Sequence, residues 1–208
     1  METRTVHVAV YDTLADWEVG HATAHINNGE YQREPGRYRV VTVGETGEPV
    51  TTMGGVRIVP DMALADLRPA DSAMLVLPGA DMWDRGGNTA FVEAARAFLD
   101  AGVPVAAICG ATRGLAAGGL IDDRPHTSNA PEYLAATGYA GAVHYRDEPA
   151  VTDGDLITAT STRPVEFARA VFARLDLYEP EVLASWYKLF ADNDPSGFYE
   201  LAGGAQGS

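Results

Sequence analysis

Two short apolar runs, each followed at once by small residues, constrain the fold more than any other feature of the chain. Residues 74–77 are Met-Leu-Val-Leu and stop at Pro78-Gly79, and residues 105–108 are Val-Ala-Ala-Ile and lead into Cys109-Gly110. Apolar runs of this length without polar alternation are typical of central strands buried on both faces. The amphipathic stretch 89–101 lies between them and predicts a helix. Strands that alternate with helices predict an α/β sandwich with a central, mostly parallel sheet.

The rest of the chain continues the same alternation. We expect further strands at 6–11, 38–43, 142–145 and 156–159, a hairpin-like excursion at 49–60, a helical turn at 61–65, and helices at 16–28, 112–117, 131–137, 164–175 and 180–191. These elements divide into one α/β domain at 1–178, a helical extension at 179–201 that packs on the domain or at a dimer interface, and a Gly-rich, disordered tail at 202–208. Ligands bind such sheets beyond the carboxyl ends of the strands.

The composition narrows the range of partners. The net charge of −14 argues against nucleic acid and anionic membrane surfaces, since both attract positive patches. A single cysteine cannot form an internal disulfide, which suits a reducing, cytoplasmic compartment. The sequence has no signal-peptide pattern and no apolar stretch long enough to span a bilayer. We therefore expect a cytoplasmic protein whose partner is a small-molecule substrate.

Cys109 stands where the strand at 105–108 turns into the helix that follows. A helix N-terminus carries partial positive charge, which favours a thiolate, and its N–H groups can stabilise a developing oxyanion. The position therefore predicts a reactive nucleophile with a lowered thiol pKa, as in a nucleophile elbow. The alternative interpretation is a buried cysteine that only packs against its neighbours.

These motifs resemble the PfpI family of the class I glutamine amidotransferase-like superfamily. The resemblance rests on the loop at 76–79, the elbow at 106–110 and the segment 153–159 leading to Phe167-Ala168, and it covers roughly residues 5–175. The superfamily also holds the Parkinsonism-associated protein deglycase, glyoxalase III enzymes and isonitrile hydratases. The resemblance implies a flavodoxin-like three-layer sandwich and a homodimer.

The resemblance also implies a set of site residues. Glu18 matches the family's acidic partner of the cysteine, and Asp16 is the rival acid, which we interpret as a helix-dipole residue. His126 is either a general base or a surface histidine. The remaining expected site residues are the oxyanion-hole positions Gly79, Ala80 and Gly110 and the substrate-pocket residues Trp83, Thr112 and Ser128.

The chain also departs from the family pattern. Family peptidases carry a histidine directly after the nucleophile, where this chain has Gly110, and several members carry one where this chain has Ser128. The late His-x-Glu pair of glutamine amidotransferases is absent. We therefore expect neither peptidase nor glutaminase activity. His21 and His25 have the spacing of metal ligands but no evident third ligand, so no metal and no cofactor is expected.

These features favour a cofactor-independent, cysteine-dependent enzyme of the hydrolase or hydratase kind that acts on a small electrophile. Glyoxalase III, deglycase, amidase-like and isonitrile hydratase-like chemistry all remain open. The alternative is a non-enzymatic sensor or chaperone-like protein that responds to oxidation of Cys109. The apolar stripe of Leu183, Trp186 and Phe190 adds to the expectation of a homodimer.

Overall fold

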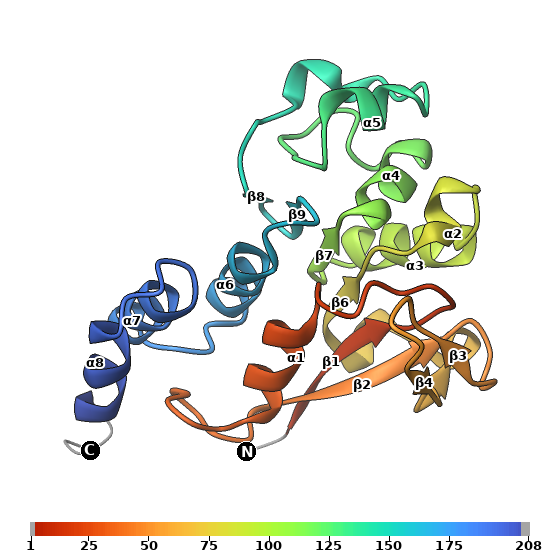
Figure 1. Ribbon diagram of the computed structural model, residues 1–208. Helices are drawn as coiled ribbons and strands as arrows, with labels where there is room; N and C mark the ends of the chain where they lie inside the picture. Colours follow the sequence, from red (N-terminus) through yellow and green to blue (C-terminus); the bar gives the residue numbers. More distant parts are fainter. Residues whose placement is uncertain (1–2, 205–208) are drawn as a thin grey trace.

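The computed structural model describes residues 3–204 and is built around one seven-stranded sheet (Figure 1). The strand order is β5-β2-β1-β6-β7-β9-β8, and every pair is parallel except β8 with β9. The sheet strands are β1 (Arg4–Ala9), β2 (Tyr38–Gly44), β5 (Met62–Ala63), β6 (Ser72–Leu77), β7 (Val105–Ile108), β8 (Ala150–Asp153) and β9 (Leu156–Ala159). The predicted mostly parallel α/β fold is confirmed.

Helices cover both faces of this sheet, which gives three layers (Figure 1). Helices α1 (Gly20–Asn27) and α6 (Pro164–Leu175) pack on one face, and α3 (Thr89–Asp100) and α4 (Gly110–Ala117) pack on the other. The remaining helices and turns are α2 (Asp81–Asp84), α5 (Pro131–Ala135), α7 (Pro180–Phe190), α8 (Ser196–Gly204), η1 (Leu64–Asp66), η2 (Pro69–Asp71) and η3 (Gly141–His144).

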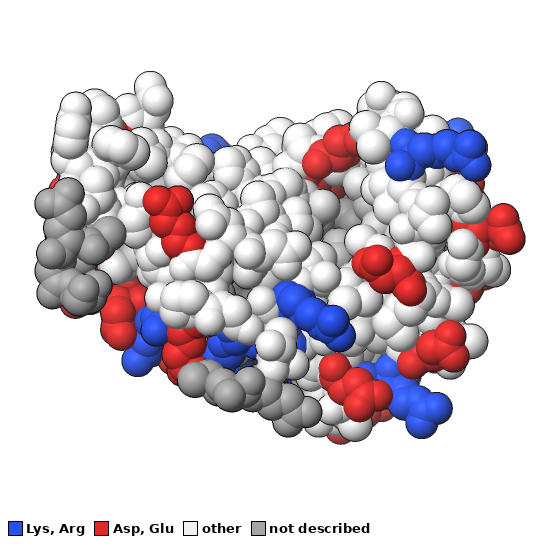
Figure 2. All heavy atoms as spheres, turned by 90° about the horizontal axis from the view of Figure 1, so that it is seen from below, with Lys and Arg blue, Asp and Glu red and all other residues white. Residues whose placement is uncertain are grey.

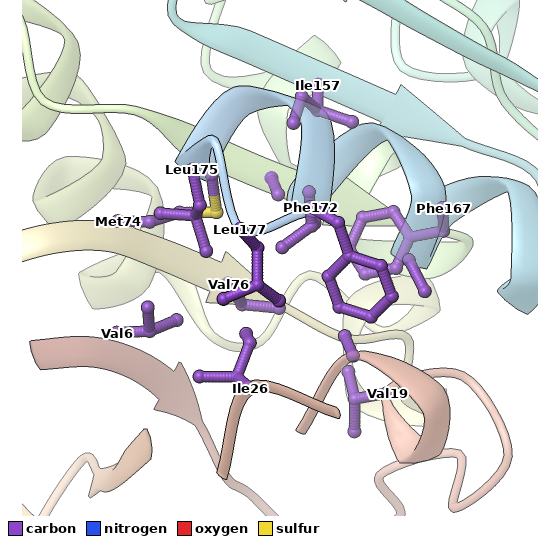
Figure 3. Close-up of a cluster of buried hydrophobic side chains, with 14 of the residues drawn as sticks. Val6, Val19, Ile26, Met74, Val76, Ile157, Phe167, Phe172, Leu175 and Leu177 are labelled. Carbon is purple, nitrogen blue, oxygen red and sulfur yellow. The ribbon is translucent and has the colours of Figure 1, made fainter. Parts of the chain in front are cut away.

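The central strands send alternate side chains into two separate cores. Met74 and Val76 of β6 join the cluster under α1 and α6, whereas Leu75 and Leu77 join the cluster under α3 and α4. Figure 3 shows the first cluster, in which Phe167 and Phe172 of α6 lie over the sheet residues. Because side chains alternate across a strand, a strand buried on both faces has no polar positions. This explains the unbroken apolar runs.

The first helix begins four residues later than expected, at Gly20 rather than Asp16. Asp16 is held outside the helix because its carboxylate accepts hydrogen bonds from the Thr52 hydroxyl (2.6 Å) and the Gly54 N–H (2.7 Å). Both partners belong to the hairpin of β3 (Val50–Thr51) and β4 (Arg57–Ile58), which confirms the predicted excursion at 49–60. Asp16 therefore anchors a hairpin, and its interpretation as a helix-dipole residue is wrong.

Two other expected elements differ. The predicted strand at 142–145 is instead the 3-10 turn η3, whose Gly141 lies so close to the Ile121 carbonyl that a Cβ would come within 2.2 Å of it. The predicted helical turn at 61–65 is divided between β5 and η1. The edge strand β8 was not predicted; it pairs with β9 across Gly154, which has a φ of +56°.

The C-terminal helices α7 and α8 lie beside α6, at the opposite side of the molecule from the β3–β4 hairpin (Figure 1). Trp186 of α7 is only 1% exposed and packs on Phe172 of α6. The aromatic stripe of α7 is thus largely part of the chain's own core and gives no support to a dimer; the homodimer stays a prediction. Residues 202–204 end α8 instead of forming a disordered tail, and 205–208 lie outside the described residues.

Charged side chains of both signs are mixed on the face turned toward the reader in Figure 2, where no extended basic surface is visible. Ion pairs also join neighbouring helices, as between Lys188 of α7 and Glu200 of α8, whose charged atoms lie 2.6 Å apart. Between residues 3 and 204, no helix combines the length and the apolar character needed to cross a membrane.

The contact between α1 and α7 depends on a neutral histidine. The Trp186 indole N–H donates to Nε2 of His25 (3.2 Å), and an indole nitrogen can only donate, so this nitrogen of His25 carries no proton. Burial lowers the pKa of His25, and His21, stacked against it on α1, lowers that pKa further. Glu30 acts in the opposite direction, to a smaller extent.

We predict that the α1–α7 contact weakens in acid. A lowered pKa in the folded state means that the unfolded chain binds more protons, so the contribution of His25 is complete above the ordinary value of 6.5 and is lost as the pH falls through the folded-state pKa. Glu18 has a raised pKa and changes the pH dependence of stability in the opposite direction. The test therefore compares wild type with a variant that differs only at His25. His25→Gln keeps an acceptor that does not titrate. Denaturant unfolding should show wild type losing stability relative to His25→Gln between about pH 7 and about pH 5.5.

Val143→Gln, at an exposed position of the η3 turn, adds no titrating group; it is the control and should follow wild type at each pH. A difference between wild type and His25→Gln that does not change with pH would contradict the prediction.

Candidate active site

Cys109 lies at the sharp turn between β7 and α4, as the sequence predicts. Its backbone has a φ of +57°. Residues other than glycine rarely adopt this conformation, which costs about 1–3 kcal/mol. Hydrogen bonds hold it there: the Cys109 N–H donates to the Ala159 carbonyl (3.0 Å), and the Cys109 carbonyl accepts from the Thr112 hydroxyl (2.6 Å). This strain is maintained by the surrounding sheet and places the sulfur at the carboxyl end of β7.

Thr112 and Ser128 support this turn from below. Their hydroxyl oxygens are 2.6 Å apart, and both residues are buried. Thr112 therefore fixes the elbow, and the expectation that it lines the substrate pocket is wrong. Ser128 borders a pocket of about 230 Å³ that is also lined by Asn129, Thr160 and Arg163.

Glu18 is fully buried and is the acidic neighbour of Cys109. One oxygen, Oε2, accepts the Gly79 N–H at 2.5 Å, and the carboxylate is hydrogen-bonded to the Cys109 thiol. The other oxygen, Oε1, has no partner within residues 3–204. Gly79 has no room for a side chain, since a Cβ would lie 2.7 Å from Oε2 of Glu18 and 2.9 Å from the sulfur. Glu18 sits in the turn before α1 and not, as expected, inside that helix.

Near neutral pH the Cys109 thiol keeps its proton, while the Glu18 carboxyl group changes its protonation. Burial raises the pKa of Glu18 to about 7, against the opposing effects of the Gly79 N–H and Cys109. Burial, and then the negative charge of Glu18, raise the pKa of the Cys109 thiol to about 12. The expected lowering of the thiol pKa is therefore wrong. The start of α4 contributes the Gly110 N–H, whose effect is smaller than burial in an apolar site.

Asn129 is a site residue that the sequence analysis missed. Its Nδ2 donates to the Cys109 sulfur at 3.4 Å, and its Oδ1 accepts the Ser161 N–H at 2.9 Å. The side chain of this loop that reaches the sulfur thus comes from residue 129, one position after Ser128. A carboxamide neither gains nor loses a proton near neutral pH, so Asn129 can orient or stabilise the sulfur but cannot act as a base.

His126 is buried away from the sulfur. Its Nδ1 lies 2.8 Å from the Arg124 carbonyl and its Nε2 lies 3.1 Å from the Tyr139 hydroxyl. Burial lowers its pKa. Because both ring nitrogens are occupied inside the 124–145 segment, the interpretation of His126 as the general base is wrong; the interpretation as a surface histidine is also wrong.

Trp83 anchors the loop that carries Gly79. Its indole N–H lies 3.0 Å from the Pro78 carbonyl and 3.1 Å from the Tyr11 hydroxyl, which donates to the same carbonyl. The ring is only 3% exposed and packs on Gly110. It borders a pocket of about 350 Å³ between α2, α3 and α4, which Cys109 does not line. Trp83 is therefore a buried anchor and not the expected wall of the Cys109 pocket.

The three expected oxyanion-hole residues have different surroundings. The Gly79 N–H donates to Glu18, and the Gly110 N–H donates to the Cys109 sulfur. The Ala80 carbonyl accepts the backbone N–H of Trp83 at 3.2 Å. A Cβ on Gly110 would lie 3.1 Å from the Trp83 ring, so a side chain at this position would require the ring to move by a few tenths of an ångström. Gly79 is thus not free to donate to an oxyanion in this state.

The histidine pair of α1 does not form part of a metal site. His21 and His25 pack edge-on against Trp186 and Phe190. Across residues 3–204, no three side chains of His, Cys, Asp and Glu are grouped so that they could hold a metal ion.

The fold and the cysteine elbow define a flavodoxin-like protein of the kind that the resemblance implied, and comparison with known proteins agrees. The sequence profile of the DJ-1/PfpI family matches residues 4–174. The "Uncharacterized protease YoaZ" of Bacillus subtilis (strain 168) is 39% identical over 204 residues, which cover 97% of each chain. The chain belongs to the DJ-1/PfpI family.

Solved structures support the same assignment. The thiJ/pfpI family protein from Bacillus anthracis has a TM-score of 0.91 at 38% identity, covering 98% of this chain and 97% of that one. The DJ-1 superfamily protein Atu0886 from Agrobacterium tumefaciens has a TM-score of 0.81 at 33% identity, covering 92% of this chain and 100% of that one. The word protease in the name of the B. subtilis relative gives no support to the expectation that this chain is not a peptidase.

Gly79→Ala should disturb both stability and the site. The added methyl group would lie within 3 Å of Glu18 and Cys109, and overpacking of this kind costs about 1–3 kcal/mol. Chemical denaturation should show this loss. Gly47→Ala, at a position with no atom within 4 Å of the new Cβ, is the control and should remain close to wild type. Equal stability of the two variants would show that the loop yields without cost.

Glu18→Gln should make the thiol more reactive toward an alkylating agent. The substitution removes the charge that raises the thiol pKa, so the rate of alkylation by iodoacetamide should begin to rise at lower pH than in wild type. Asp16→Asn removes a nearby charge that faces the hairpin instead of the sulfur and is the control. Identical pH–rate profiles for Glu18→Gln and wild type would show that Glu18 does not affect the pKa of the Cys109 thiol.

Proposed function

We propose that this protein is a cysteine-dependent enzyme of the hydrolase or hydratase kind that adds water to a small electrophile, with Glu18 as the base. The observation that carries the proposal is the fully buried Glu18 carboxylate beside a protonated Cys109 thiol. The Gly79 N–H holds one carboxylate oxygen, and the other has no partner among the residues that the structure describes. Such an acid with a pKa raised to about 7 can both accept and return a proton near neutral pH.

The first step joins sulfur to the substrate. As the S–C bond forms, Glu18 takes the thiol proton, so the thiolate needs no independent existence. Glu18 then delivers that proton to the carbonyl oxygen of an aldehyde, or to the carbon of an isonitrile. The product is a hemithioacetal in the first case and a thioformimidate in the second.

Water completes either reaction without an outside oxidant. With a 2-oxoaldehyde, a proton moves from C1 to C2 of the hemithioacetal, so C1 is oxidised and C2 is reduced, and water hydrolyses the resulting thioester to a 2-hydroxy acid. With an isonitrile, water attacks the thioformimidate carbon and releases a formamide. Both routes return the thiol and need only residues of this chain.

Negative charge that develops on the substrate needs donors nearby. Asn129 Nδ2 and the Gly110 N–H both approach the sulfur, so they lie where a group bonded to that sulfur would be held. We assign them, with the Ala80 N–H, to stabilising this charge. Gly79 is left out of this set because Glu18 occupies its N–H.

The same arrangement argues against amide cleavage. Expelling an amine requires a group that delivers a proton to the leaving nitrogen, a task that histidine performs in cysteine and serine hydrolases. His126 is engaged with Arg124 and Tyr139, and the residue at the sulfur is Asn129. We therefore extend the proposal to the absence of peptidase and glutaminase activity. The raised thiol pKa likewise gives no support to an oxidation sensor, since oxidation proceeds through the thiolate.

The test is turnover of methylglyoxal and of an aryl isonitrile by wild type, Cys109→Ser and Glu18→Gln. Wild type should turn over at least one of them, with kcat rising as the pH passes about 7, because Glu18 must be ionised to accept the proton. Cys109→Ser should show only the background rate, and Glu18→Gln should lose about a hundredfold to ten-thousandfold in kcat. Absence of turnover with both compounds would overturn the proposal.

Casein, a fluorogenic aminopeptidase substrate and glutamine serve as the amide panel. None of them should be cleaved. Cleavage that disappears in Cys109→Ser would restore the peptidase or glutaminase interpretation.

A further inference from the structure

Trp17 is the exposed tryptophan of the chain and directly precedes Glu18. It is 51% exposed, whereas Trp83 and Trp186 are almost fully buried. A single exposed aromatic side chain needs no explanation in itself. The position of Trp17 does need an explanation, because hydrogen bonds connect this residue to the sulfur of Cys109.

The contacts form a closed ring around the site. The Trp17 indole N–H donates to the Ser161 carbonyl (3.2 Å), and the Ser161 N–H donates to Oδ1 of Asn129 (2.9 Å). Asn129 donates to the Cys109 sulfur, and Cys109 is hydrogen-bonded to Glu18, the neighbour of Trp17. Trp17 is therefore connected to the sulfur through Ser161 and Asn129, and the hydrogen bond to Ser161 orients its indole.

The exposed part of the Trp17 indole is apolar. An indole has one donor and no acceptor, and Ser161 already uses that donor. Met53 and Val56 on the β3–β4 hairpin, which is held to Leu14 and Asp16, are exposed apolar side chains on the neighbouring segment. On the side of Asn129, by contrast, the adjoining pocket is polar and lined by Thr160 and Arg163.

We propose that Trp17 is a substrate-recognition residue that holds the flat, apolar substituent of the electrophile while its reactive carbon meets the Cys109 sulfur. The substrate class is then an aryl-bearing electrophile, because a fixed indole face is complementary to another flat ring and aromatic contacts add affinity beyond the area buried. This inference rests on the proposed function for the identity of the reacting group, but not for the binding of the ring.

Binding is tested without chemistry. N-phenylformamide and N-cyclohexylformamide are the hydration products of phenyl and cyclohexyl isonitrile, and they differ in whether the ring is flat. Calorimetry with wild type should give tighter binding of the phenyl compound. Trp17→Ala should weaken phenyl binding about three- to tenfold, change cyclohexyl binding less, and be rescued in part by Trp17→Phe.

Turnover adds the second readout. With phenyl isonitrile as substrate, Trp17→Ala should raise KM by the same factor and leave kcat within about twofold, since the ring takes no part in proton transfer. If no isonitrile is turned over but the phenyl preference in binding depends on Trp17, the inference stands and the proposed chemistry fails.

Three results would overturn the inference while leaving the proposed function intact. They are no measurable binding of N-phenylformamide, equal losses for the two formamides in Trp17→Ala, and a change from dimer to monomer in light scattering on Trp17→Ala. The last result would mean that a second copy of the chain covers the indole.

Discussion

The structure depends on a buried carboxylate held against a half-buried thiol by a single backbone N–H. Glu18 and Cys109 come from segments that are distant in the sequence, and the Gly79 N–H fixes the carboxylate where only glycine leaves room. Burying an ionisable acid is unfavourable unless it is hydrogen-bonded, so the Pro78-Gly79 loop must be held firmly. Trp83 supplies that support by donating to the Pro78 carbonyl. The site thus rests on the loop at the end of β6 as much as on the elbow at the end of β7.

This arrangement changes the protonation state expected of the Cys109 thiol. Burial and the neighbouring carboxylate raise the pKa of the Cys109 thiol, so the start of α4 does not produce a resting thiolate. Glu18, with a pKa raised to about 7, is instead the group that changes protonation near neutral pH. Near neutral pH the wild-type thiol then reacts in the same step in which Glu18 takes its proton. Such a site resists alkylation and oxidation that proceed through a free thiolate.

The fold and the position of Cys109 at the elbow could be predicted because their signals are local. The apolar runs of β6 and β7 need only a buried strand, and the position of Cys109 needs only a strand that meets a helix. The wrong role for His126 and the omission of Asn129 arose because their positions in the site are not set by local sequence. Which side chain of that loop reaches the sulfur depends on long-range contacts, such as the Thr127 N–H with the Thr158 hydroxyl (2.9 Å). The direction of the thiol pKa shift depends on burial, which sequence position alone does not give. For the missed strand β8, the Asp-Gly pair at 153–154 was an available hairpin signal.

The most direct test of the buried pair is an infrared titration of the Glu18 carboxyl group. The difference between wild type and Glu18→Gln isolates the C=O band of the protonated acid, and its loss with rising pH reports the proton on Glu18 itself. The account predicts a midpoint at about 7, because burial outweighs the Gly79 hydrogen bond. A midpoint near 4.5, the ordinary value for glutamate, would show that Glu18 is solvated and does not serve the Cys109 thiol as its base.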